Sequence, residues 1–116
     1  MSRTALILAA HGSRVDPTIN AQIDEYVSQI DRLGIFDRVT KAFHRGEPAF
    51  ASVLDQLDAD YVTVVPVMTS DGYYCDVVLR RELAKNRRFA RVRLRQTPPV
   101  GVHTGVIALV ERRDAA

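Results

Sequence analysis

One short stretch, "ALILAAHGSR", places a histidine directly after an apolar segment (residues 5–10). Gly12 then lets the backbone turn sharply, and Ser13 and Arg14 add polar groups at the same point. A neutral imidazole can bind a divalent metal ion or transfer a proton near neutral pH. The pattern therefore predicts a strand that presents His11 to a metal or a reacting group.

Further polar side chains follow the next two apolar segments. His44-Arg45-Gly46-Glu47 comes after the second segment, and the third leads into residues 69–75, "TSDGYYC". A metal-handling site needs a few nitrogen or oxygen ligands and an open coordination position. Acidic, histidine or tyrosine groups on these loops can complete such a site around His11.

Structural roles for the same residues stay open at this point. His44 also fits a surface residue on an edge strand, and His103 fits the cap of a final helix. The two tyrosines, Tyr73 and Tyr74, can simply pack, and Asp71 before Gly72 is typical of a turn. No tight ligand spacing decides between these roles.

Two other chemistries fit poorly. A phosphate-binding loop would place several Gly, Ser or Thr amides at a helix start, and "HGSRVDP" is poor in them. A histidine phosphatase would carry Arg-His-Gly, but Ala10 precedes His11. Neither class is therefore predicted.

The composition is that of one globular domain over residues 1–116, with 47% hydrophobic and 26% charged residues. One cysteine excludes a disulfide within the chain and a cysteine-rich metal site. No run approaches the ~20 apolar residues that cross a bilayer, and "MSRTALILAAHGS" lacks the polar region and cleavage site of a signal peptide. We expect a cytoplasmic protein without a membrane partner.

Basic residues are concentrated in one block, because eight of the 16 Lys and Arg residues fall within residues 80–95. Such a block can mark a nucleic acid, an acidic small molecule or a solvated face. The alternation of Arg with apolar residues in "ARVRLRQ" favours a solvated edge strand, and no aromatic residues alternate with the cations for base stacking. We expect no nucleic acid partner.

Apolar runs alternate with helical patterns along the chain. The expected strands are residues 5–10, 38–43, 61–68 and 90–96, and the expected helices are residues 17–34, 47–57, 73–86 and 103–113. Asp16 is expected to cap the first helix, with Pro17 in its first turn and Gly34 at its end. This alternation predicts an α/β fold with a four-stranded parallel sheet in the order 2-1-3-4 and helices on both faces. Ligands bind beyond the carboxyl ends of the strands in such sheets, which is where all three histidines fall.

The residues also resemble a known family, the CbiX-type sirohydrochlorin cobaltochelatases of the class II chelatases. The resemblance rests on "LILAAHGSR", on "AF" and "EP" within residues 42–48, on "VTVVPVMTSDGYY" and on "TPPVGVH", in the family's order over nearly the whole chain. It implies a chelatase-like (flavodoxin-like) three-layer α/β/α fold and, by analogy with the short form of the family, a homodimer. The implied activity is that of a lyase that inserts a divalent metal into sirohydrochlorin for cobalamin or sirohaem biosynthesis. Cobalt is the implied metal, with iron or nickel as alternatives; it is a substrate, so no permanent cofactor is implied.

The resemblance assigns roles to individual residues. The resemblance implies that His11 binds the metal and helps to take up the pyrrole protons, and we expect a nearby carboxylate such as Glu47 to accept protons as well. The eight carboxylates of sirohydrochlorin would be bound by arginines such as Arg14 and Arg45. The other implied substrate-binding residues are Ser13, Ser70, Gly72 and Tyr73.

One position departs from the family pattern. Tyr74 stands where a second metal-binding histidine is expected, and a tyrosine side chain, with an ordinary pKa of about 10, is a weak ligand unless the metal deprotonates it. His44 or Glu47 can replace that ligand, in the same chain or across a dimer. Alternatively, the protein is a noncatalytic relative that only binds a tetrapyrrole or a metal.

Overall fold

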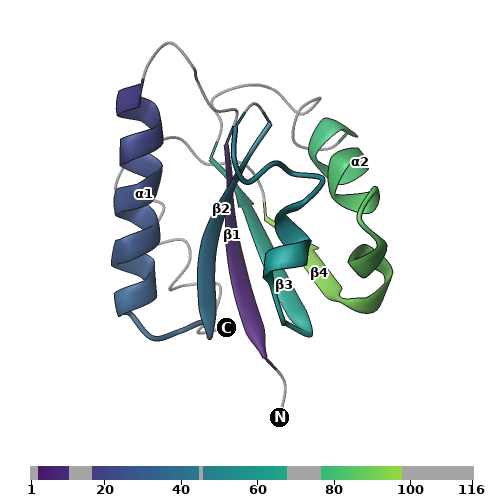
Figure 1. The fold of residues 1–116 in the computed structure, drawn as a ribbon. Helices are drawn as coiled ribbons and strands as arrows, with labels where there is room; N and C mark the ends of the chain where they lie inside the picture. The colour runs from purple at the N-terminus through teal and green to yellow at the C-terminus, as the bar shows by residue number, and fades with distance from the viewer. Residues whose placement is uncertain (1–2, 11–16, 45, 68–76, 98–116) are drawn as a thin grey trace.

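The computed structural model describes residues 3–10, 17–44, 46–67 and 77–97, which form a four-stranded parallel sheet with helices on both faces (Figure 1). The strand order is β2-β1-β3-β4, as predicted. In chain order the elements are β1 (Thr4–Ala10), α1 (Pro17–Arg32), β2 (Arg38–Phe43), the 3₁₀ helix η1 (Val53–Gln56), β3 (Tyr61–Pro66), α2 (Leu79–Ala84), the 3₁₀ helix η3 (Arg87–Arg91) and β4 (Arg93–Gln96). No helix in these segments has the length and apolar character needed to cross a membrane.

Strand β1 lies at the centre because almost all of its side chains are apolar and can be buried on both faces. Residues 5–10 are at most 2% exposed. Successive side chains of a strand point to opposite faces, so Ala5, Ile7 and Ala9 join one core cluster, whereas Leu6 and Leu8 join the other. The continuous apolar run therefore serves two cores at once, as expected for a buried parallel strand.

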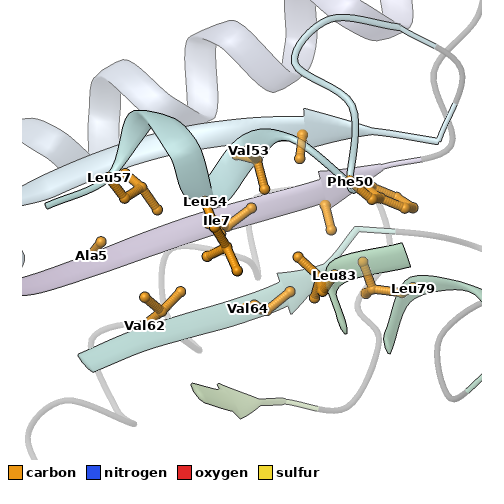
Figure 2. Close-up of a cluster of buried hydrophobic side chains, with 12 residues drawn as sticks. Ala5, Ile7, Phe50, Val53, Leu54, Leu57, Val62, Val64, Leu79 and Leu83 are labelled. Atoms are coloured by element: carbon orange, nitrogen blue, oxygen red, sulfur yellow. The ribbon is translucent and has the colours of Figure 1, made fainter. Parts of the chain in front are cut away.

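The first core lies between the sheet and the side covered by η1 and α2. Figure 2 shows Val53 and Leu54 from η1 and Leu79 and Leu83 from α2 directed at the sheet, with Phe50 at the carboxyl end of the cluster. All of these side chains are at most 1% exposed. The close packing of these buried side chains holds the carboxyl ends of the strands in place on the η1 and α2 side of the sheet.

The second core lies under α1, on the opposite side of the sheet (Figure 1). Ile23 and Ile30 are fully buried, and they lie seven residues apart, which is two helical turns on one face. The helix spans Pro17–Arg32, and Gly34 has φ +69°, a conformation that favours glycine. The predicted range of 17–34 is confirmed to within two residues, whereas the predicted cap at Asp16 lies outside the described residues.

The predicted helix over residues 47–57 is wrong. Only η1 is helical there, because the Phe43 N–H donates to the Pro48 carbonyl oxygen (2.8 Å) and the Phe50 N–H donates to the Phe43 carbonyl oxygen (3.2 Å). Ala49 thereby pairs with Phe43 as a parallel bridge. Residues 48–50 continue along the end of β2, and the chain becomes helical only afterwards.

The boundaries near the fourth strand also differ from the prediction. The described part of the third helix is α2, Leu79–Ala84, and η3 occupies the first residues of the expected strand, so that β4 begins at Arg93. The side chain of Asn86 accepts a hydrogen bond from the Arg88 N–H (2.9 Å) and thereby caps η3. Residues 73–76 and the predicted closing helix, residues 103–113, lie outside the described residues.

Candidate functional site at the carboxyl ends of the strands

Main-chain hydrogen bonds align the carboxyl ends of three strands. The His44 N–H donates to the carbonyl oxygen of Ala10 (3.0 Å), and the Val67 N–H donates to that of Ala9 (2.7 Å). The ladder therefore extends one residue beyond the assigned ends of β2 and β3. The carboxyl ends of β1, β2 and β3 lie together at one end of the sheet, which is the end that the sequence predicts to bind a ligand.

Both the backbone and the ring of His44 fix this residue at the carboxyl end of β2. Its side chain is on the same face of β2 as Ala42, because side chains alternate along the strand. There the imidazole stacks on Phe50, with 5.9 Å between the ring centroids and 29° between the ring planes. Strand β2 is an edge strand, as expected, but His44 is half-buried rather than fully exposed.

The loop after His44 is folded tightly against the end of β2. A Cβ atom on Gly46 would lie 3.1 Å from the Phe43 Cβ and 3.3 Å from two ring carbons of Phe43, so the loop backbone passes directly over that ring. The Glu47–Pro48 peptide bond is cis. Glu47 is exposed at this turn, where its carboxylate is accessible to protons and to a ligand.

Sequence reasoning missed the role of Phe50, because it placed this residue inside a helix. Phe50 is 1% exposed, supports the ring of His44 and bonds the end of β2 through its N–H. The sequence gives no clear signal of this role, because Pro48 suits the first turn of a helix as well as a loop.

The remaining predicted site residues lie outside the described residues: His11, Ser13, Arg14, Arg45, Ser70, Gly72, Tyr73 and Tyr74. The structure describes the strand ends that lead into them, Ala10 before His11 and Val67 before residues 68–76. Within the described segments, no group of three His, Cys, Asp or Glu side chains is placed to hold a metal ion. A metal site at the carboxyl ends of the strands would therefore need residues from the segments that follow β1 or β3.

Comparison with known proteins gives relatives of the predicted kind. A curated protein of Halobacterium salinarum, named as a probable sirohydrochlorin cobaltochelatase, is 39% identical over 79 residues, which are 68% of this chain and 27% of that protein. The chain thus spans about a quarter of the length of this relative.

Solved structures support the same fold. A multi-domain protein from Deinococcus radiodurans, described as structurally similar to chelatases, is 28% identical with a TM-score of 0.71; the match covers 100% of this chain and 29% of that one. A putative cobalamin biosynthesis CbiX protein from Marinobacter aquaeolei is 18% identical with a TM-score of 0.61, covering 97% of this chain and 93% of that one, and this likeness shows the fold alone. The expected chelatase-like α/β fold is confirmed.

The resemblance noted in the sequence is confirmed by a family model. The CbiX model matches residues 5–115, which begin within β1 and include every residue predicted for the site. The chain belongs to the CbiX family.

Proposed function

We propose that this protein is a sirohydrochlorin metal chelatase, which inserts a divalent metal ion into a tetrapyrrole for cobalamin or sirohaem biosynthesis. Membership of the CbiX family and the name of the Halobacterium relative support this activity. Cobalt is the proposed metal, with iron and nickel as alternatives. The metal is a substrate, so the proposal includes no permanent cofactor.

The observation that carries the proposal is the hydrogen bond between His44 and Ala10. Ala10 directly precedes His11, and consecutive α-carbons lie about 3.8 Å apart. The two histidines thus follow neighbouring strands at the same edge, and we expect both imidazoles to reach one metal ion. Two imidazole ligands leave coordination positions open for water and then for the pyrrole nitrogens.

Proton removal is the second requirement of metal insertion. Two N–H protons must leave the macrocycle as the metal enters, and a base close to the metal lowers the barrier. We assign this role to His11 and to Glu47, whose exposed position lets it pass protons to solvent. Substrate carboxylates would be bound by Arg14 and Arg45, with further contacts from Ser13, Ser70, Gly72 and Tyr73.

Tyr74 bears on whether the protein is an active enzyme. We propose that His44 supplies the second strong ligand where the family pattern would place a histidine at position 74, with Tyr74 as a weaker ligand. The alternative function is a noncatalytic tetrapyrrole or metal carrier, and the presence of Tyr74 is the observation that favours it. A homodimer in the cytoplasm, with the substrate cleft completed by the second subunit, remains part of the proposal.

The direct test follows the absorbance of sirohydrochlorin during incubation with Co²⁺ and the protein. Acceleration that is lost in His11→Ala and kept in Asp37→Ala, a control at the amino-terminal end of the sheet, supports the chelatase. Tetrapyrrole binding without acceleration supports the carrier instead. Equal rates for His11→Ala and the unmodified protein would contradict the role assigned to His11.

A further inference from the structure

A second feature lies on the side of the sheet covered by η1 and α2, where a hollow of about 850 Å³ opens between η1 and η3. We call it the basic hollow; its polar lining residues are Asp55, Lys85, Asn86, Arg87, Arg88 and Arg91. Helix η3 leads directly into the start of β4, and the Arg93 N–H donates to the Asp60 carbonyl oxygen ahead of β3 (2.8 Å). The lining runs from Ala51, which follows Phe50, to Arg91 at the end of η3, and it includes none of the residues proposed for the metal-insertion site.

The charge of the hollow is strongly unbalanced. Lys85 has a partner, because its Nζ lies 2.9 Å from a carboxylate oxygen of Glu82. Within the described segments, Arg87, Arg88 and Arg91 form no ion pair, and Asp55 is the one carboxylate in the lining. Several cations around one cavity repel each other, and an anion bound among them would relieve that repulsion.

The wall of the hollow is fixed by a buried polar residue. Asn86 is 7% exposed; its side-chain amide donates to the Ala51 carbonyl oxygen (3.2 Å), and its oxygen accepts from the Arg88 N–H (2.9 Å). These two bonds join η3 to the segment that leads into η1. Phe89, also within η3, packs against the first core. The backbone that carries the arginines is thus ordered before any ligand arrives, which lowers the entropic cost of binding.

The remaining arginines of the basic block are placed differently. The guanidinium of Arg93 lies over the ring of Tyr61, with 5.7 Å to the ring centroid, and Arg95 donates to Thr63 Oγ1 (3.4 Å). Both are on β4, an edge strand, and their positions fit the solvated edge expected from the sequence. That interpretation does not account for the cluster at residues 85–91, which surrounds a cavity.

We propose that the basic hollow binds a small polyanion with three or more phosphate or carboxylate groups. Its volume is within the range of small-molecule pockets, about 300–1,000 Å³. Guanidinium groups bind both kinds of anion through paired N–H donors. The described lining includes no aromatic ring, so the site selects charge rather than a nucleobase or a macrocycle. This site is separate from the proposed metal-insertion edge and does not depend on the chelatase activity.

The experiment is isothermal titration calorimetry of the full chain with two probes, inorganic tripolyphosphate and tricarballylate, at low and at moderate salt. The test variant is Arg87→Gln/Arg91→Gln, since both side chains are exposed and their loss leaves the capping bonds of Asn86 intact. The matched control is Arg32→Gln/Arg38→Gln, which removes the same charge from exposed positions at the end of α1 and the start of β2. Far-ultraviolet circular dichroism checks that all three proteins are folded.

The proposal expects saturable 1:1 binding of at least one probe, about tenfold weaker in the test variant and within twofold of the unmodified protein in the control. The stronger probe identifies whether phosphate or carboxylate groups are preferred. Equal weakening in both variants would overturn the proposal, because the effect would then come from net charge alone. Absence of saturation with both probes would also overturn it.

Discussion

The two ends of the sheet differ in the part that side chains play. Main-chain hydrogen bonds join the strands at both ends, among them the bond from the Tyr61 N–H to the Arg3 carbonyl oxygen (3.1 Å). At the amino-terminal end, carboxylates hold the start of β1: Asp60 accepts from the Arg3 N–H (2.9 Å), Asp37 accepts from the Thr4 N–H (2.9 Å), and Asp58 pairs with the Arg3 guanidinium (2.6 Å). At the carboxyl end, the bonds that align the strands come from the main chain of His44 and Val67.

Polar side chains therefore serve different purposes at the two ends: at the amino-terminal end they stabilise the structure, and at the carboxyl end they are candidates for the chemistry. Asp37 and Asp60 are occupied in holding backbone N–H groups and Asp58 in pairing with Arg3, so these acidic residues are poorly suited to binding a substrate. At the carboxyl end, backbone bonds and the buried rings of Phe43 and Phe50 fix the strands, so the alignment does not depend on the side chains of His44 and Glu47. These polar groups can therefore be used in chemistry without weakening the sheet.

The largest expected effect on stability comes from truncating Phe50, which packs in the first core at the carboxyl ends of the strands. Phe50→Ala leaves a cavity in the first core and should lower the free energy of unfolding by about 3 kcal/mol or more, measured by urea denaturation. Phe50→Leu retains most of the volume and should lose clearly less. A loss below about 1 kcal/mol for the alanine variant would contradict the supporting role assigned to this ring.

The position of Phe50 could not be predicted from the sequence, whereas the strands and their order could. The strand β2 was predicted at Arg38–Phe43 and is observed there, and the strand order followed from the alternation of apolar and helical segments. Those features depend on local patterns. The parallel pairing of Ala49 with Phe43 depends on a loop that brings residue 49 back beside residue 43, and the apolar spacing of residues 47–57 does not indicate such a loop.

The sequence predicts that the candidate site lies at the carboxyl ends of the strands, but it does not predict the packing that supports His44 there. The carboxyl ends of parallel strands meet at one edge, so a sequence with correctly placed strands also places His44 there. Its stacking on Phe50 could not be inferred, because residue 50 had been assigned to the wrong element. The roles of His11 and Tyr74 stay predictions, since these residues lie outside the described segments.

The second effect concerns metal binding and should appear at the carboxyl end only. His44→Phe keeps an aromatic ring against Phe50 but removes both imidazole nitrogens, so we expect Co²⁺ binding about tenfold weaker, or about 1.4 kcal/mol, with little change in stability. Titration of the protein with Co²⁺ in the absence of tetrapyrrole gives the affinity. Unchanged Co²⁺ affinity would exclude His44 as a ligand.

The third effect should appear at the amino-terminal end. Asp37→Ala removes the acceptor of the Thr4 N–H and should cost about 1 kcal/mol of stability, because the bond is charge-assisted but solvent-exposed. Chemical denaturation gives this value, and the same variant should bind Co²⁺ as the unmodified protein does. A loss of Co²⁺ affinity in Asp37→Ala would break the separation between the two ends.

Gly46→Ala tests how tightly the loop after β2 is packed, and it should cost less stability than Phe50→Ala. The added Cβ would lie 3.1 Å from the Phe43 Cβ. Because Phe43 is 3% exposed in the second core, its side chain has little room to move away. We expect about 0.5–1 kcal/mol of destabilisation, because the loop must shift by a few tenths of an ångström. Since His44 and Glu47 flank this loop, the same shift should weaken Co²⁺ binding more than Asp37→Ala does, although Asp37→Ala costs at least as much stability. An unfolding curve and a Co²⁺ titration on the two variants together decide this: the reverse order of affinities would mean that the loop does not position the metal-binding groups.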